Sequence, residues 1–132
     1  MAVIALDLGG TKLASALFRH DGKILQRNVI PLNRRKGEEV SELITDDLRQ
    51  LLVVARAKKL SVHGVGVSVP GISYQKLGKV WAPNIPGWSQ AGGFPLRQKI
   101  LSALRDKKVL VTIDSDRACY ISGEAWRGCL SP

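Results

Sequence analysis

The sequence predicts an α/β protein in which a mixed β-sheet is flanked by helices. Two short apolar runs at the start of the chain, residues 2–8 and 13–18, are bounded by glycine or charged residues, as buried strands usually are. Residues 38–59 carry apolar side chains at helical spacing. Residues 62–71 form a nearly continuous apolar run, which is typical of a parallel strand covered on both faces. Strands followed by an alternation of helices and strands indicate this fold class.

The first three predicted elements are antiparallel strands. Residues 2–8 and 13–18 meet at Gly9 and Gly10, which can take positive φ at little steric cost, so we expect a tight hairpin there. The segment DGKILQRNVIPL, residues 21–32, begins with an Asp-Gly turn and continues as a third strand.

A long helix, a buried strand and an irregular loop follow. In residues 38–59 the acidic side chains come early and the lysines late, an order that favours the helix dipole. The strand at residues 62–71 leads into residues 72–93, where Pro, Gly, Trp and Asn occur without clear periodicity. A connection of this length is typical of a binding loop.

The last third of the chain predicts a helix, a fifth strand and a final helix. Pro95 begins the first of these helices, whose apolar stripe comprises Leu96, Ile100, Leu101 and Leu104. Residues 108–113 form the strand, and residues 117–127 form the last helix. The order βββαβαβα, with right-handed crossovers, predicts a five-stranded mixed sheet in the ribonuclease H-like arrangement.

The composition is that of one soluble domain. The chain has 132 residues, of which 45% are hydrophobic and 23% charged, so we expect one folded unit with a sizeable core. No apolar run approaches the length of a membrane span and no basic leader precedes the first strand, which predicts a cytoplasmic protein without membrane contact. Cys119 and Cys129 lack metal-type spacing with His20 or His63, and we interpret both as reduced, structural thiols.

The chain is strongly basic, with a formal net charge of +9. Such a charge is compatible with nucleic acid, a phosphate-bearing ligand or an acidic partner domain. The lysines and arginines lie at predicted helix ends and in loops, without interleaved aromatic residues that would stack on bases. This pattern favours a solvated surface and no nucleic-acid partner; a non-catalytic polyanion-binding domain is the alternative that charge alone supports.

The first hairpin carries candidate phosphate-binding residues. Backbone N–H groups at Gly9 and Gly10 can come close to an anion because glycine has no Cβ. The segment is not a Walker loop, since the glycine spacing differs and a strand follows it instead of a helix. Asp7 would repel a bare phosphate, so its useful role is to hold a hydrated Mg²⁺, directly or through water, that binds the phosphate oxygens. The alternative is an ordinary hairpin with an aspartate at the edge of its turn.

Two further stretches fall at predicted strand ends, where ligands gather in sheets of this kind. Pro70 is rigid and Gly71 permits a close backbone approach to a substrate, although a simple turn is equally compatible with them. Asp116, in the segment IDSDRACYISGE, could point into the cleft as a general base. Helix N-capping by Asp114, Ser115 or Asp116 is the alternative.

The predicted binding loop contains the segment WAPNIPGW. Asn84 offers both an amide donor and a carbonyl acceptor, which suits a vicinal diol. Trp81 and Trp88 could pack on a sugar face, or they could anchor the loop to the core, which we expect of at least one of them.

Together, the segments DLGGTK, VPG, APNIPGW and DSD followed by GE resemble the motifs of the ROK family (repressor, open reading frame, kinase), within the sugar-kinase, hexokinase and actin superfamily. The resemblance covers almost the whole chain, and APNIPGW is especially similar to the glucokinase-type members. It implies ATP-dependent phosphorylation of a hexose hydroxyl, by preference that of glucose at C6, with Mg²⁺, in a cleft between two domains.

The resemblance also implies roles for individual residues. The motif around the phosphates of Mg-ATP matches Asp7, Gly9, Gly10, Thr11 and Lys12. Gly71 and Asn84 match positions that face the sugar, and Asp116 matches the catalytic base. Ser115 departs from the family, which usually has a sugar-binding Asn at that position, and a serine hydroxyl reaches less far.

ROK kinases have a second domain with a cysteine-rich zinc motif, further sugar ligands and the adenosine site, and none of these is found in residues 1–132. We therefore interpret residues 1–132 as the N-terminal domain of a ROK sugar kinase, poorly active alone, whose partners are a hexose, ATP and the missing C-terminal domain. The family also implies a homodimer, and it makes N-acetylated hexosamines the next substrates to test. The alternatives are a sugar-sensing ROK transcription regulator and a non-catalytic sugar-binding protein.

Overall fold

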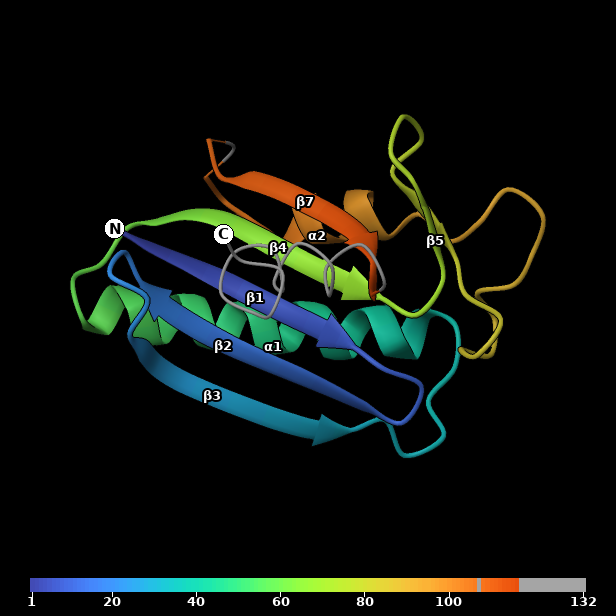
Figure 1. The fold of residues 1–132 in the computed structure, drawn as a ribbon, viewed down its shortest axis with the longest axis horizontal. Helices are drawn as coiled ribbons and strands as arrows, with labels where there is room; N and C mark the ends of the chain where they lie inside the picture. The colour runs from blue at the N-terminus through green and yellow to red at the C-terminus, as the bar shows by residue number, and fades with distance from the viewer. Residues whose placement is uncertain (107, 117–132) are drawn as a thin grey trace, which may run out of the picture.

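A computed structural model of the chain describes residues 1–106 and 108–116. Its centre is a five-stranded sheet with the strand order β3-β2-β1-β4-β7. The strands are β1 (Ala2–Leu8), β2 (Lys12–Arg19), β3 (Ile24–Pro31), β4 (Val62–Val69) and β7 (Leu110–Ser115). Two helices, α1 (Glu38–Ala57) and α2 (Leu96–Ala103), lie against each other and against the sheet (Figure 1).

The pairing of the strands is mixed, as the sequence predicts. β1 pairs antiparallel with β2, and β2 pairs antiparallel with β3. β1 and β4 are parallel, and so are β4 and β7; α1 lies in the crossover from β3 to β4, and α2 lies in the crossover from β4 to β7. The predicted α/β fold class, with a five-stranded mixed sheet and helices, is confirmed.

The core lies between the sheet and α1. Alternate residues of β1, namely Ala2, Ile4, Leu6 and Leu8, are buried, because successive side chains of a strand point to opposite faces. The helix buries a matching stripe that includes Ile44, Leu48 and Leu51. Each large aliphatic side chain buried in this way stabilises the fold by roughly 1.5–3 kcal/mol. The predicted helix is therefore confirmed, although it ends two residues earlier, at Ala57.

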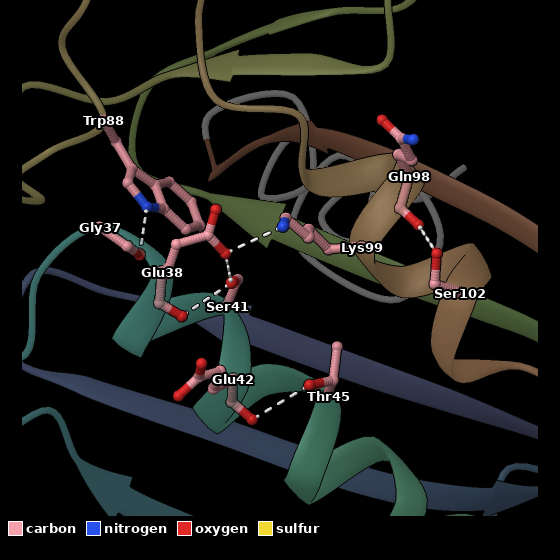
Figure 2. A network of polar contacts seen from close by, with 9 residues as sticks. All are labelled: Gly37, Glu38, Ser41, Glu42, Thr45, Trp88, Gln98, Lys99 and Ser102. Atoms are coloured by element: carbon pink, nitrogen blue, oxygen red, sulfur yellow. Dashed lines mark hydrogen bonds and ion pairs between the residues drawn. The ribbon is translucent and has the colours of Figure 1, made fainter.

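Polar contacts fasten α1 to its neighbours. The Lys99 ammonium of α2 lies 3.0 Å from the Glu38 carboxylate at the start of α1 (Figure 2). On the other side of α1, Asn28 Nδ2 of β3 donates to Asp47 Oδ1 at 2.8 Å. Asp47 is only 4% exposed, and its Oδ2 has no hydrogen-bond partner in the described part of the chain.

Several local expectations are corrected. The segment after β4 is not wholly irregular, because β5 (Ile72–Tyr74) and β6 (Lys79–Trp81) form a small antiparallel hairpin. Strands of three residues are too short for a period of two to be recognised in the sequence. Leu101 is 42% exposed, and Ala103 joins the buried face of α2 instead.

Two further differences concern the site. The last strand runs from Leu110 to Ser115 and not from residue 108 to 113, so Asp114 and Ser115 belong to the strand itself. Gly9 and Gly10 do not have positive φ.

The predicted helix at 117–127 lies outside the described residues, as do Cys119 and Cys129. No helix in residues 1–106 and 108–116 is long and apolar enough to cross a membrane.

Candidate functional site

One end of the sheet gathers the segments that the sequence singles out. The turn between β1 and β2, the carboxyl ends of β4 and β7, and the hairpin labelled β5 all lie toward the same end of the molecule (Figure 1). β1, β4 and β7 run parallel, so their carboxyl ends share one edge, which is where ligands bind in open α/β sheets.

A cavity of about 540 Å³ lies at this edge. Its lining comes from β4 and the turn after it, the β5–β6 hairpin and loop, and the end of β7: Pro70, Gly71, Ile72, Ser73, Trp81, Pro83, Asn84, Asp114, Ser115 and Asp116. The four residues predicted to face a substrate, Gly71, Asn84, Ser115 and Asp116, are therefore brought together, although up to 45 positions separate them in the sequence.

Gly71 is required by the chain's own backbone. A Cβ on Gly71 would lie 2.1 Å from the Trp81 carbonyl oxygen and 2.9 Å from Ala82 Cα. The structure therefore shows a close backbone approach between Gly71, the residue before β5, and Trp81, the last residue of β6. The absence of a side chain at Gly71 lets the two strands of the hairpin lie this close beside the cavity.

The loop after β6 is built on buried side chains. Ile85 and Trp88 are fully buried, and Trp88 stacks on Phe94 with 4.5 Å between ring centroids. Trp88 Nε1 donates to the Gly37 carbonyl oxygen at 3.0 Å, which ties the loop to the start of α1 (Figure 2). Trp88 is therefore the tryptophan that anchors the loop.

Trp81, at the end of β6, and Asn84, in the loop that follows, both line the cavity. Trp81 is half-buried and lines the cavity, with its Nε1 donating to the Ser89 carbonyl oxygen at 3.1 Å. Asn84 is exposed, and its amide makes no hydrogen bond within the described residues. An unengaged donor and acceptor beside a partly exposed indole suit a polyhydroxylated ligand.

The β1–β2 turn borders this cavity. Gly9 N–H donates to the Lys12 carbonyl oxygen at 2.9 Å and closes the turn, while Leu32 N–H donates to the Thr11 carbonyl oxygen at 2.9 Å. A Cβ on Gly10 would lie 3.9 Å from Asn84 Cβ, so the turn and the loop are neighbours. Gly10, Thr11 and Lys12 are exposed, which leaves their polar groups accessible to a ligand.

Three carboxylates lie along the neighbouring face of the sheet. Asp7 of β1 is in register with Ser68 of β4, which is in register with Asp114 of β7. Asp7, Asp114 and Asp116 all line a hollow of about 1170 Å³ over this face. Asp116 and Asp114 line both this hollow and the smaller cavity, so the two spaces meet at the end of β7.

The carboxylates of this region differ in what they offer a divalent cation. Asp114 Oδ1 accepts a hydrogen bond from Ser115 N–H at 2.8 Å, which turns this carboxylate toward its own backbone. The described residues contain no group of three or more His, Cys, Asp or Glu side chains able to hold a metal ion. Exposed Asp7 beside an accessible turn fits Mg²⁺ in the form usual at phosphate sites, where one or two carboxylates, water and the phosphates supply the ligands.

Sequence reasoning missed two residues of this region. Ser73 Oγ and Gln75 Nε2 both donate to the Ile113 carbonyl oxygen of β7, at 3.1 and 2.6 Å. Serine and glutamine in an irregular segment carry no recognisable signal, and these contacts cross about 40 positions of sequence. Only the folded chain reveals them.

Comparison with known proteins adds a family and a fold. A model described as the ROK family matches residues 3–129. The N-acetyl-D-glucosamine kinase of Citrobacter koseri is 32% identical over 121 residues, which cover 91% of this chain and 36% of that protein. The glucokinase of Halalkalibacterium halodurans is 30% identical over 127 residues, which cover 95% of this chain and 36% of that protein.

A solved structure agrees with these matches. The ROK hexokinase from Thermus thermophilus superposes with a TM-score of 0.73 at 28% identity, over 95% of this chain and 38% of that one. The chain therefore spans only 36% of the length of either curated relative named above.

Proposed function

The chain belongs to the ROK family, as its motifs predict, and on that premise we propose that the protein phosphorylates a hexose with ATP and that this chain forms the sugar-binding half of the cleft. One observation carries the proposal. Gly71, Asn84, Ser115 and Asp116 line a single cavity, and the β1–β2 turn borders it. A hexose in the cavity would thus lie beside the segment suited to the phosphates of the donor.

Asp116 is the proposed general base. Its carboxylate accepts the proton of the reacting hydroxyl as that oxygen attacks the γ-phosphorus of ATP; the bond from this phosphorus to the β–γ bridging oxygen breaks, and ADP leaves. Asp116 is assigned this role in preference to Asp114 because Asp116 is the aspartate that matches the catalytic base of the family motif. Asn84 orients the sugar through its unengaged amide, and Ser115 offers a shorter hydrogen-bonding group.

The donor's phosphates are assigned to the β1–β2 turn. Gly9 closes the turn through its N–H, Gly10 and Thr11 present backbone to the ligand, Lys12 supplies a positive charge, and Asp7 holds Mg²⁺ directly or through water. Mg²⁺ supplies charge neutralisation of the phosphates when bound. Each of these roles depends on positioning, which is the main source of catalysis in phosphoryl transfer.

A second domain completes the cleft in this proposal. The coverage of 36% of each curated relative leaves room for the adenosine site, further sugar ligands, a structural zinc and a dimer contact outside residues 1–132. A half cleft does not exclude water or align both substrates, so the isolated chain should bind sugar weakly and turn over little.

The test is a coupled assay of ADP formation with glucose, N-acetylglucosamine and N-acetylmannosamine, on this chain and on the complete product of its gene. Asp116→Asn should lower kcat by about 10²–10⁴-fold and leave sugar binding largely intact. Asp46→Asn, at an exposed position of α1, is the matched control and should leave kcat unchanged.

Three outcomes contradict parts of the proposal. Normal turnover in Asp116→Asn would remove Asp116 from the base role. Loss of sugar binding with intact folding would make Asp116 a sugar ligand. Sugar binding without turnover in the complete wild-type protein would instead indicate a sensor that keeps the pocket without the chemistry.

A further inference from the structure

The β5–β6 hairpin is attached to the sheet at one backbone atom. Ser73 Oγ donates to the Ile113 carbonyl oxygen at 3.1 Å, and Gln75 Nε2 donates to the same oxygen at 2.6 Å. Gln75 Nε2 also lies 3.4 Å from Ser73 Oγ, so the two side chains and the carbonyl form one network. We call this network the Ile113 contact.

The position of Ile113 explains why the Ile113 contact matters. In the described part of the chain, β7 is the outermost strand and pairs only with β4. The Ser73 and Gln75 side chains therefore both donate to a carbonyl of the outermost strand of the sheet. The residues that follow Ile113 are Asp114, Ser115 and Asp116, which form one wall of the cavity.

The opposite wall belongs to the hairpin. Gly71 immediately precedes β5, and Trp81 ends β6 two residues before the loop reaches Pro83 and Asn84. β5 and β6 are paired antiparallel, from Ile72 with Trp81 to Tyr74 with Lys79, so the hairpin is one hydrogen-bonded unit. A bond from this hairpin to β7 therefore fixes the distance between the two walls.

We propose that Ser73 and Gln75 are positioning residues, whose joint contact with the Ile113 carbonyl sets the end of β7, and with it Asp116, relative to the Trp81–Asn84 wall. The catalytic consequence rests on the proposed sugar kinase function. A displacement of about 1 Å between a base and its substrate can lower turnover by about 10²-fold, even when the changed residue does not touch the reacting atoms. Neither side chain needs to contact the sugar for this effect.

The experiment measures kcat and KM for the hexose in the complete product of the gene, with Ser73→Ala, Gln75→Leu and the double variant. Two controls make the same chemical changes at exposed positions away from the site: Gln98→Leu on α2 and Ser61→Ala just before β4. Ser73→Thr keeps the hydroxyl and serves as the conservative rescue.

Loss of the contact should lower kcat about tenfold or more in the double variant, with little change in KM, while Ser73→Thr and both controls stay near the wild-type kcat. The single effects should not simply multiply in the double variant, because both donors contact one carbonyl. Wild-type kcat in the double variant, or a raised KM at unchanged kcat, would overturn the proposal. The second of these results would make Ser73 a sugar ligand.

Amide hydrogen exchange supplies a readout that does not depend on activity. The double variant should exchange faster at residues 113–116 than the wild type, and the Gln98→Leu control should not. If the wild-type protein phosphorylates no hexose, the kinase proposal fails, and exchange alone decides the Ile113 contact. Unchanged exchange at residues 113–116 would overturn the positioning role whatever the protein phosphorylates.

Discussion

Gly71→Ala is the sharpest test of how the cavity is built. The new methyl carbon would lie 2.1 Å from the Trp81 carbonyl oxygen, whereas a carbon and a carbonyl oxygen make their closest ordinary contacts at about 3.3 Å. The neighbouring atoms in this contact are backbone, so relief requires β6 to move by about 1 Å, and no side chain can rotate away. Overpacking of this kind typically costs about 1–3 kcal/mol.

The measurement is urea denaturation of the chain, followed by sugar binding. With a denaturant slope of about 1–3 kcal/mol per molar, a loss of about 2 kcal/mol should lower the urea midpoint by about 1 M. Sugar binding should weaken as well, because Trp81 and Asn84 move with β6.

Gly66→Ala is the matched control. A Cβ at Gly66, in the middle of β4, would meet only Thr112 Oγ1, at 3.8 Å. Since glycine inside a strand is less stable than alanine by roughly 0.5–1 kcal/mol, this variant should be as stable as the wild type or slightly more stable. Equal midpoints for Gly71→Ala and Gly66→Ala would refute the steric argument.

Two further predictions concern buried polar atoms. Asp47→Asn should change the thermal stability at neutral pH by less than about 1 kcal/mol, because the Oδ1 acceptor for Asn28 remains and an amide NH2 group takes the place of a buried oxygen that has no partner in the described residues; a loss above about 2 kcal/mol would indicate that this oxygen has a partner that the NH2 group cannot replace. Trp88→Phe removes the indole donor to the Gly37 carbonyl and part of a fully buried side chain, so unfolding should cost about 1–3 kcal/mol less. Trp81→Phe, at the half-buried tryptophan, should change stability less than Trp88→Phe does but should weaken sugar binding more. If Trp81→Phe is instead the less stable variant and Trp88→Phe the weaker sugar binder, the roles given to the two tryptophans are exchanged.

Much of the fold is accessible from the sequence because its signals are local. Residues 2–8 form a short apolar run and residues 38–59 carry apolar side chains at a period of 3.6, and the structure confirms a strand at Ala2–Leu8 and a helix at Glu38–Ala57. β4 is recognisable as a parallel strand from its apolar run. The β5–β6 hairpin is not recognisable, because its strands contain three residues each and depend on contacts with residues far along the chain.

The candidate site divides in the same way. Its residue types could be chosen from motifs, since Asp, Asn and Gly have chemical roles that follow from their side chains. The arrangement of these residues in space could not be predicted from motifs. The structure also corrects the reason given for Gly9 and Gly10, which do not have positive φ. The structure adds a reason for Gly71 that the sequence did not show, which is its close approach to the Trp81 carbonyl.

By itself the sequence determined the five strands of the main sheet, the long helix, the family and the set of polar residues, because these depend on neighbours within a few positions. Only the tertiary structure decided which tryptophan is buried and which side chains hold the end of β7. Those outcomes depend on contacts between segments roughly 40 or more residues apart, such as Trp88 with Gly37 and Gln75 with Ile113. A periodic pattern carries no information about such pairs, since it records which face of an element is apolar and not what that face meets.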